Sequence, residues 1–298
     1  MSASPPIKRP SAFSLLEQVP VTAADGTTFV VRVLPNDDPA VPVALVLPAM
    51  ALKAKFYLPL LTALRAAGLS AAACDLRGQG ESAPLLGDGP DFGYKELIET
   101  DLPAVVAAVR ERFPQAPLFL FGHSLGGQLA LLFAAANPDA VDGVAVIGTG
   151  TVFWRAFGPR RWFEALWSIQ WIGLVAAVRG SWPGGVLIPG AMAGGVMTDW
   201  ARHSRTSRYR FRGRSLDYDA ALRALTAPVL TIALDRDLLG PKSNVDFLGR
   251  RMPAARLTAW DVDEDSGVVH RDHFEWVKDS AVLAPAVAHW VRTGSLPS

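Results

Sequence analysis

The chain has 298 residues, of which 50% are hydrophobic and 19% are charged, and its formal net charge is +1. This composition excludes an intrinsically disordered protein, and the small net charge gives no reason to expect a nucleic-acid partner. Cys74 is the single cysteine, so no intrachain disulfide framework exists. The longest apolar stretch, 166–178, is interrupted by Gln170 and is too short to span a bilayer, and residues 1–16 lack the apolar region of a signal peptide. We therefore expect a cytoplasmic protein without stable membrane insertion.

The first half of the chain opens with a predicted hairpin and then alternates strands with helices. Asp25-Gly26 is a strong turn signal between two segments, 16–23 and 27–34, that are predicted to be antiparallel strands. Short apolar runs bounded by turn residues indicate buried strands, and longer runs with helical spacing indicate helices. The elements predicted next are a strand at 43–47, a helix at 57–67, a strand at 69–74, a helix at 94–112, a strand at 117–121, a helix at 128–136 and a strand at 143–147.

The alternation stops at residue 151 and resumes after residue 216. A strand at 228–234, a helix at 242–251, a strand at 256–260 and a closing helix at 280–292 are predicted there. Strands that alternate with helices at this spacing favour a mostly parallel sheet covered on both faces. We therefore predict an α/β protein with a core domain, residues 1–150 and 217–298, and an inserted lid, residues 151–216.

A serine between glycines joins the strand at 117–121 to the helix that follows it. Residues 122–127 read Gly-His-Ser-Leu-Gly-Gly, which is typical of a nucleophile elbow, where larger side chains would collide with the strand and the helix. The alternative is that these glycines only end a strand and cap a helix. In the elbow interpretation, Ser124 stands at the sheet edge and the N–H of Leu125 faces an oxyanion. This pattern resembles the α/β-hydrolase superfamily.

The resemblance covers nearly the whole chain. Residues 75–82, Asp-Leu-Arg-Gly-Gln-Gly-Glu-Ser, resemble a structural segment that many α/β hydrolases carry after the fourth strand. Residues 48–50, Pro-Ala-Met, with Phe-Tyr at 56–57, are similar to a bacterial subgroup of predicted serine hydrolases related to the serine aminopeptidase and monoglyceride lipase branch. The resemblance implies the α/β-hydrolase fold, with a mostly parallel eight-stranded sheet, helices on both faces and an inserted lid.

A serine hydroxyl needs a base within hydrogen-bond reach, and the chain has five histidines. His123 lies inside the elbow, His203 in the insert and His289 on the closing helix. His270 and His273 remain as candidates, and both lie in the loop before that helix, where the superfamily has its base. The resemblance favours His273, because a phenylalanine follows it as in the related subgroup, and His270 is the second candidate.

The acid that orients the base is expected after the strand at 228–234, where Asp235 and Asp237 are the candidates. Asp237 is followed by Pro241, which resembles the aspartate and proline spacing of the family. Asp237 is therefore favoured and Asp235 is the alternative. The other location that some hydrolases use, after the strand at 143–147, has no carboxylate. The resulting order of serine, aspartate and histidine is the one this fold uses.

The oxyanion hole is expected to use two backbone N–H groups, one from Leu125 and one from the loop after the strand at 43–47. Superposing residues 48–50 on the family's His-Gly-x segment makes Met50 the second donor. Pro48 and Ala49 differ from the family's histidine and glycine, which changes the shape of this loop. A backbone donor requires no particular side chain, so the hole can still form.

The predicted lid is rich in tryptophan and arginine. Residues 151–214 hold six of the nine tryptophans, and ten arginines against two acids, Glu164 and Asp199, give the segment a formal charge of +8. Such a segment suits an apolar acyl chain or ring on a molecule that carries an anionic group. Alternatively, the arginines pair with the acidic core and hold the lid shut. Prolines and glycines at 183–195 predict irregular backbone over the site.

These residues predict a serine hydrolase that acts on a carboxylic ester, with a hydrophobic acyl or alcohol part, through an acyl-enzyme intermediate. The alternatives are an amidase or aminopeptidase-type serine hydrolase, and a non-catalytic protein that binds a hydrophobic ligand on the same fold. The expected partner is a small hydrophobic substrate, and a homodimer and docking of the lid on an anionic membrane stay open. No cofactor is expected, because a phosphate loop and a dinucleotide fingerprint are absent. No metal site is expected either, since the acidic run at 261–265 is interpreted as a solvated loop.

Overall fold

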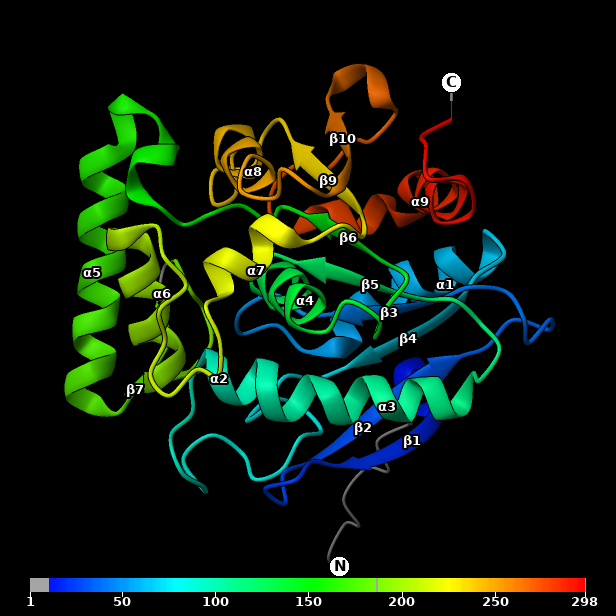
Figure 1. The fold of residues 1–298 in the computed structure, drawn as a ribbon, viewed down its shortest axis with the longest axis horizontal. Coiled ribbons are helices and arrows are strands. Elements are labelled where there is room, and N and C mark those ends of the chain that lie inside the picture. The colour runs from blue at the N-terminus through cyan, green and yellow to red at the C-terminus, as the bar shows by residue number, and fades with distance from the viewer. Residues whose placement is uncertain (1–10, 186, 298) are drawn as a thin grey trace, which may run out of the picture.

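The computed structural model describes residues 11–185 and 187–297 (Figure 1). Its central eight-stranded sheet is formed by β1 (Glu17–Thr22), β2 (Thr28–Leu34), β3 (Val43–Leu47), β4 (Ser70–Cys74), β5 (Leu118–His123), β6 (Gly143–Ile147), β9 (Pro228–Leu234) and β10 (Arg256–Val262). The order across the sheet is β1-β2-β4-β3-β5-β6-β9-β10. The pairs β1–β2 and β2–β4 are antiparallel, and every pair from β4 to β10 is parallel. The predicted mostly parallel, eight-stranded sheet is confirmed.

The α-helices of the described residues are α1 (Leu58–Ala66), α2 (Tyr94–Glu96), α3 (Leu102–Arg112), α4 (Leu125–Ala136), α5 (Trp162–Arg179), α6 (Gly194–Thr206), α7 (Tyr218–Ala224), α8 (Lys242–Gly249) and α9 (Ser280–Thr293). A π-helical turn, Leu97–Asp101, joins α2 to α3. Short 3-10 helices lie at Ala12–Leu15, Ala54–Tyr57, Trp154–Phe157, Pro159–Arg161, Glu264–Ser266 and Glu275–Asp279. A small antiparallel pair is formed by β7 (Ser181–Trp182) and β8 (Met192–Ala193).

Helices cover both faces of the sheet and create two hydrophobic cores. All five side chains of β3 are buried, and alternate residues of a strand point to opposite faces. Leu45 accordingly packs in a core that includes residues of α3 and α4. Val46 packs in the other core, which includes residues of α1 and α9. A continuous apolar run is what a parallel strand needs when both of its faces are covered.

The predicted strands are all present, with bounds that differ by no more than two residues. Two predicted helices differ from the observed ones. The helix predicted at 94–112 is interrupted by the π-helical turn. The helix predicted from residue 128 begins three residues earlier, at Leu125, and its first turn includes the glycines at 126 and 127.

The irregular backbone predicted at 183–195 is present at the described residues 183–185 and 187–191, and α6 begins at Gly194. The remainder of the segment 151–216 is mostly regular. It contains α5 and α6, which pack against each other in close contact, and α5 forms the outer edge of the molecule (Figure 1). A Cβ built on Gly173 of α5 would lie 2.4 Å from the Cβ of Ala201 on α6. The missing side chain therefore allows the two helices to approach closely. Irregular backbone is confined mainly to the connections, including the described residues between β7 and β8.

Two hydrogen bonds attach α6 to residues 91–94, at and before the start of α2. The carboxylate of Asp199 accepts from the backbone N–H of Tyr94 at 3.2 Å, and that of Asp91 accepts from the N–H of Gly195 at 3.1 Å. Burial raises the pKa of Asp199 to about 6, because burial disfavours the charged carboxylate. None of the helices within 11–185 and 187–297 combines the length and hydropathy that crossing a membrane requires.

Candidate active site

Ser124 stands between β5 and α4 in a backbone conformation that few residues other than glycine adopt. Its φ is 51° and its ψ is −114°, which is the local strain that a nucleophile elbow stores. A Cβ on Gly122 would lie 2.3 Å from the Cα of Gly127, and a Cβ on Gly126 would lie 2.2 Å from the carbonyl oxygen of Leu47. Glycine is therefore required on both sides of the serine, and the sharp turn holds Ser124 at the carboxyl edge of the sheet.

His273 and Asp237 form a buried hydrogen-bonded pair next to this edge. The Nδ1 atom of His273 lies 2.7 Å from Oδ2 of Asp237. The other carboxylate oxygen, Oδ1, accepts the backbone N–H groups of Leu239 and Gly240 at 2.8 and 2.7 Å. Because a carboxylate only accepts hydrogen bonds, Nδ1 carries the proton and donates it, which leaves Nε2 as an acceptor.

The end of β6 packs tightly against the His–Asp pair. Gly148 has a φ of +54°, and a Cβ at this position would lie 2.9 Å from Oδ2 of Asp237 and 3.3 Å from Nδ1 of His273. A Cβ on Gly240 would in turn lie 2.4 Å from the carbonyl oxygen of Gly148. The absence of side chains at both glycines therefore lets the backbone approach the pair directly.

Ser124 and His273 line one cavity, which offers about 820 Å³ of space including its open mouth. The apolar side chains around it come from the segment 151–216 and from the loops after β9 and β10, and they include Phe157, Ile169, Leu187, Trp200, Leu238 and Phe274. Polar side chains also line it, namely Gln128, Arg161, Glu164 and Ser168. Ser124 and His273 therefore share one cavity whose wall is mainly apolar.

Both sequence-predicted oxyanion donors, Met50 and Leu125, line the same cavity. The N–H of Ala49 donates to the Tyr57 hydroxyl at 2.9 Å, so this N–H is already hydrogen-bonded. The next backbone N–H in the loop is that of Met50. Ala51 follows with a φ of 60°, which is unusual for a residue with a side chain. A Cβ on Gly190 of the 151–216 segment would lie 2.8 Å from the Cβ of Ala51. That segment therefore packs directly on the loop.

A buried polar network that the sequence did not reveal lies behind the site. The Tyr57 hydroxyl is 2.7 Å from Nδ1 of His123, and Nε1 of Trp276 donates to Nε2 of His123 at 3.4 Å. Because an indole N–H only donates, Nε2 accepts and Nδ1 donates to Tyr57. Burial, with a smaller contribution from His273, holds the pKa of His123 well below its usual range. His123 therefore stays neutral, and its ring lies 4.9 Å from that of His273.

The second candidates from the sequence are bound to other partners. Oδ1 of Asp235 accepts from Nε of Arg271 at 2.7 Å. Nδ1 of His270 lies 3.0 Å from the carboxylate of Asp279, which also accepts the backbone N–H of His270. Among the described residues, neither Asp235 nor His270 lines the cavity that holds Ser124.

The two remaining histidines also lie apart from Ser124. Nε2 of His203, on α6, is 3.0 Å from the Thr151 hydroxyl, and its ring stacks on that of Tyr209 at 4.0 Å. Burial lowers the pKa of His203 to about 3. His289 lies on α9 and is not among the residues that line the cavity. Of the five histidines, His273 is therefore the one that the fold brings to the cavity with Ser124.

Among the residues that the structure describes, no arginine of the 151–216 segment forms an ion pair with a carboxylate outside that segment. Within 11–185 and 187–297, their ion pairs are Arg161 with Glu164 at 3.5 Å and Arg202 with Asp199 at 4.0 Å, both inside the segment. Arg161 also donates to the carbonyl oxygen of Leu238 at 2.7 Å, which ties α5 to the loop after β9. The structure thus contradicts the interpretation that core carboxylates neutralise these arginines.

Comparison with known proteins identifies the family to which the chain belongs. Residues 39–187, half of the chain, match the family model described as serine aminopeptidase, S33. Monoglyceride lipase of Rattus norvegicus is 36% identical over 52 residues, which is 17% of this chain and 17% of that protein. The biotin biosynthesis bifunctional protein BioHC of Cellvibrio japonicus is 30% identical over 186 residues, 58% of this chain and 37% of that protein. The matches thus span well under two thirds of these relatives' lengths.

Solved structures share the fold over almost the whole chain. DcsB in complex with its substrate analogue aligns with a TM-score of 0.62 at 15% identity, covering 93% of this chain and 99% of that one. The esterase RhEst1 from Rhodococcus sp. ECU1013 aligns with a TM-score of 0.57 at 22% identity, covering 93% and 98%. The order of the strands, the sharp turn at Ser124 and these structural neighbours identify the chain as an α/β hydrolase. Within that superfamily, the chain belongs to the serine aminopeptidase, S33 family.

Proposed function

We propose that the protein is a serine hydrolase that cleaves a carboxylic ester through an acyl-enzyme intermediate. Oγ of Ser124 attacks the carbonyl carbon, and Nε2 of His273 takes the hydroxyl proton. The same proton passes to the leaving alcohol oxygen as the ester C–O bond breaks. Water then attacks the acyl-enzyme, with His273 again taking a proton and returning it to Ser124. Asp237 holds the imidazole with Nδ1 protonated, and the N–H groups of Leu125 and Met50 stabilise the oxyanion.

The observation that carries this proposal is the convergence of three features in one cavity. A strained serine, a histidine whose Nδ1 is 2.7 Å from a buried carboxylate, and apolar walls lie together. The apolar lining favours a substrate with a hydrophobic acyl or alcohol part, because burying such a group contributes roughly 25 cal/mol per Å². The names of a monoglyceride lipase relative and of an esterase neighbour are consistent with ester chemistry.

A second candidate is amide or peptide cleavage at an N-terminus, which the family description favours. Binding of a free α-ammonium group calls for a carboxylate in the cavity. Glu164 lines the cavity, but its side chain is 66% exposed and pairs with Arg161 at 3.5 Å. This arrangement supports the ester substrate ahead of the amide substrate.

Labelling with a fluorophosphonate and reading the intact mass tests the nucleophile directly. We expect one adduct on the wild-type protein, none on Ser124→Ala and a strongly slowed reaction on His273→Ala. His270→Ala is the matched control and is expected to label like the wild type, because His270 is bound to Asp279. Absence of labelling in the wild type would instead support the non-catalytic ligand-binding protein.

A substrate panel separates the two hydrolase candidates. We expect p-nitrophenyl esters to be hydrolysed with kcat/KM rising as the acyl chain lengthens, until the apolar cavity is filled. Aminoacyl p-nitroanilides are expected to react far more slowly. Faster cleavage of an aminoacyl anilide than of every ester would overturn the ester assignment and leave the serine mechanism standing.

A further inference from the structure

Five large apolar side chains form an exposed stripe along α5. Their exposed fractions are 75% for Phe163, 69% for Trp167, 62% for Trp171, 56% for Leu174 and 79% for Val178. At 3.6 residues per turn these positions fall within an arc of about 80°, and at 1.5 Å per residue they extend over about 22 Å. Exposed apolar side chains are usually scattered singly, so a continuous stripe marks an interaction surface.

The opposite side of α5 faces the site. Ala165, Ser168 and Ile169 line the cavity that contains Ser124, and Ile172 and Ala176 are buried. Within the described residues, the inner face of α5 is therefore packed against the protein, whereas most of the surface of the outer-face side chains is exposed. Because α5 is the outermost element on its side of the molecule (Figure 1), the stripe is presented to whatever approaches that side.

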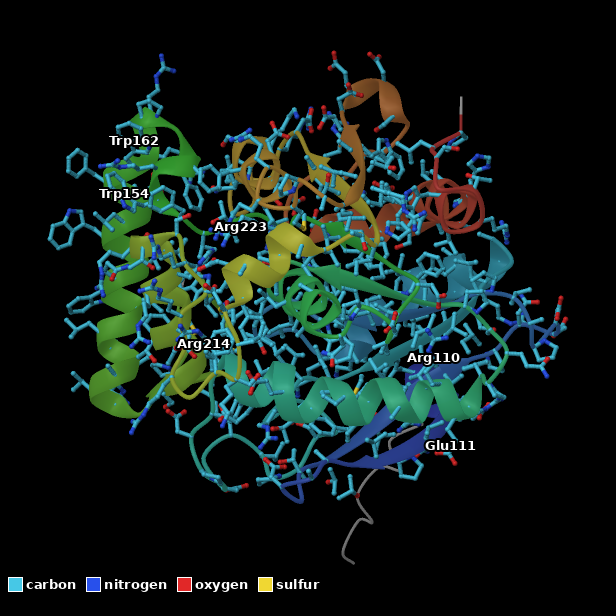
Figure 2. The ribbon with its side chains drawn as sticks, viewed as in Figure 1. Arg110, Glu111, Trp154, Trp162, Arg214 and Arg223 are labelled. Atoms are coloured by element: carbon cyan, nitrogen blue, oxygen red, sulfur yellow. The ribbon has the colours of Figure 1, made fainter. Side chains whose placement is uncertain are left out.

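Exposed arginines lie near the start of α5 and beside the helix. Arg155 is exposed and lies over the Trp154 ring at 4.7 Å, and Figure 2 shows Trp154 near the upper end of α5. Arg160 is exposed just before the helix. Arg205 is exposed on α6 and donates to Oε1 of Gln170 on α5 at 3.2 Å, which places its guanidinium beside the stripe. Arginine and aromatic side chains together suit the boundary between lipid headgroups and acyl chains.

We propose that the outer face of α5 docks the protein on an anionic phospholipid surface, with the helix lying in the plane of the interface. Interfacial helices combine an apolar face with a basic rim in this manner. The face fits a second copy of the chain poorly. A stripe about 22 Å long and about 10 Å wide covers roughly 220 Å², against about 800 Å² per partner in a stable dimer. In a dimer through this face, two copies of the segment 151–214, each with a formal charge of +8, would face each other and repel. This docking does not depend on the hydrolase activity proposed above.

Vesicle flotation of the full-length protein tests the docking surface. We expect wild-type protein to float with vesicles of phosphatidylglycerol and phosphatidylcholine at low salt, and high salt to weaken this binding. Vesicles with brominated acyl chains should quench the tryptophan emission, because Trp167 and Trp171 lie in the stripe. The triple variant Phe163→Ser, Trp167→Ser and Trp171→Ser is expected to bind at least roughly tenfold more weakly.

The matched control removes three exposed leucines from other parts of the surface, Leu15→Ser, Leu85→Ser and Leu257→Ser, and should float like the wild type. Arg160→Glu with Arg205→Glu should weaken binding to anionic vesicles and leave binding to neutral vesicles unchanged. Hydrolysis of a short soluble ester reports whether the stripe variant is folded and active, independently of its binding to vesicles. We expect its rate to equal that of the wild type. No flotation at low salt, equal flotation of the stripe variant, or a wild-type dimer that the stripe variant dissociates would each overturn the proposal.

Discussion

Replacing Asp237 by asparagine changes the proposed catalytic site with almost no change in side-chain volume. In the wild type, Oδ1 accepts the N–H groups of Leu239 and Gly240, and Oδ2 accepts from Nδ1 of His273. The asparagine oxygen is expected to keep the two backbone donors, because the NH2 group cannot accept them. That NH2 group then faces Nδ1 of His273, so Nδ1 has to accept and the ring proton moves to Nε2.

A His273 with its proton on Nε2 cannot take the proton of Ser124. The corresponding change in a serine protease lowers kcat by about 10⁴, which equals about 5 kcal/mol of transition-state stabilisation at 1.36 kcal/mol per factor of ten. We expect a loss of this order for Asp237→Asn with a soluble p-nitrophenyl ester. The free energy of unfolding should fall by only about 1–2 kcal/mol, because a charge-assisted hydrogen bond is replaced by a neutral one. Urea titration measures this second quantity.

Asp235→Asn is the matched control for this change. Asp235 belongs to the same loop, but its carboxylate binds Arg271 and its side chain is 39% exposed. We expect the kcat of this variant to stay within about threefold of the wild type, because a partly exposed ion pair contributes about 0–1 kcal/mol. The reasoning would be refuted if Asp237→Asn kept more than a tenth of the activity, or if the two variants lost activity equally.

Three further changes have defined outcomes. Gly148→Ala puts a methyl group 2.9 Å from the Asp237 carboxylate at a positive φ, so the ester kcat should fall by about 10², and an unchanged kcat would contradict this packing. Tyr57→Phe leaves the buried N–H of Ala49 without its acceptor, and urea titration should show a loss of about 1–3 kcal/mol. His203, with its pKa lowered to about 3, takes up a proton more readily in the unfolded chain, so stability is lost as the pH falls below about 6.5. This amounts to about 2 kcal/mol at pH 5, and His203→Phe should show a shallower decline of Tm between pH 7 and 5 than the wild type.

The central sheet could be predicted from the sequence because its inner strands β3, β4, β5 and β6 are buried at every position. An apolar run such as Val43–Leu47 has few alternatives, and its bounds were predicted without error. The elbow was predictable for a related reason, since Gly122 and Gly126 are required by close backbone contacts. The acid and base were narrowed to two residues each, and their positions after β9 and after β10 bring Asp237 and His273 together.

Features that depend on contacts between distant segments were not predictable in the same way. The network of Tyr57, His123 and Trp276 joins residues far apart in the chain, and each of them reads locally as an ordinary core residue. The helices α5 and α6 were not predicted, because the sequence of 151–216 showed only that the alternation of strands and helices stops there. Gly173 in fact permits the packing of α5 against Ala201, so this glycine supports the helix pair instead of interrupting it.

The contact between Gly190 and Ala51 has a consequence for engineering. Gly190 directly follows Pro189, which lines the cavity, whereas Ala51 directly follows the proposed oxyanion donor Met50, and no space for a methyl group separates Gly190 from Ala51. Substitutions intended to reshape the cavity wall near residue 190 are therefore expected to shift the backbone beside Met50 as well. Under the proposed mechanism, a change at position 190 is therefore expected to affect both substrate selectivity and turnover rate, so a library aimed at new substrates should vary positions 51 and 190 together.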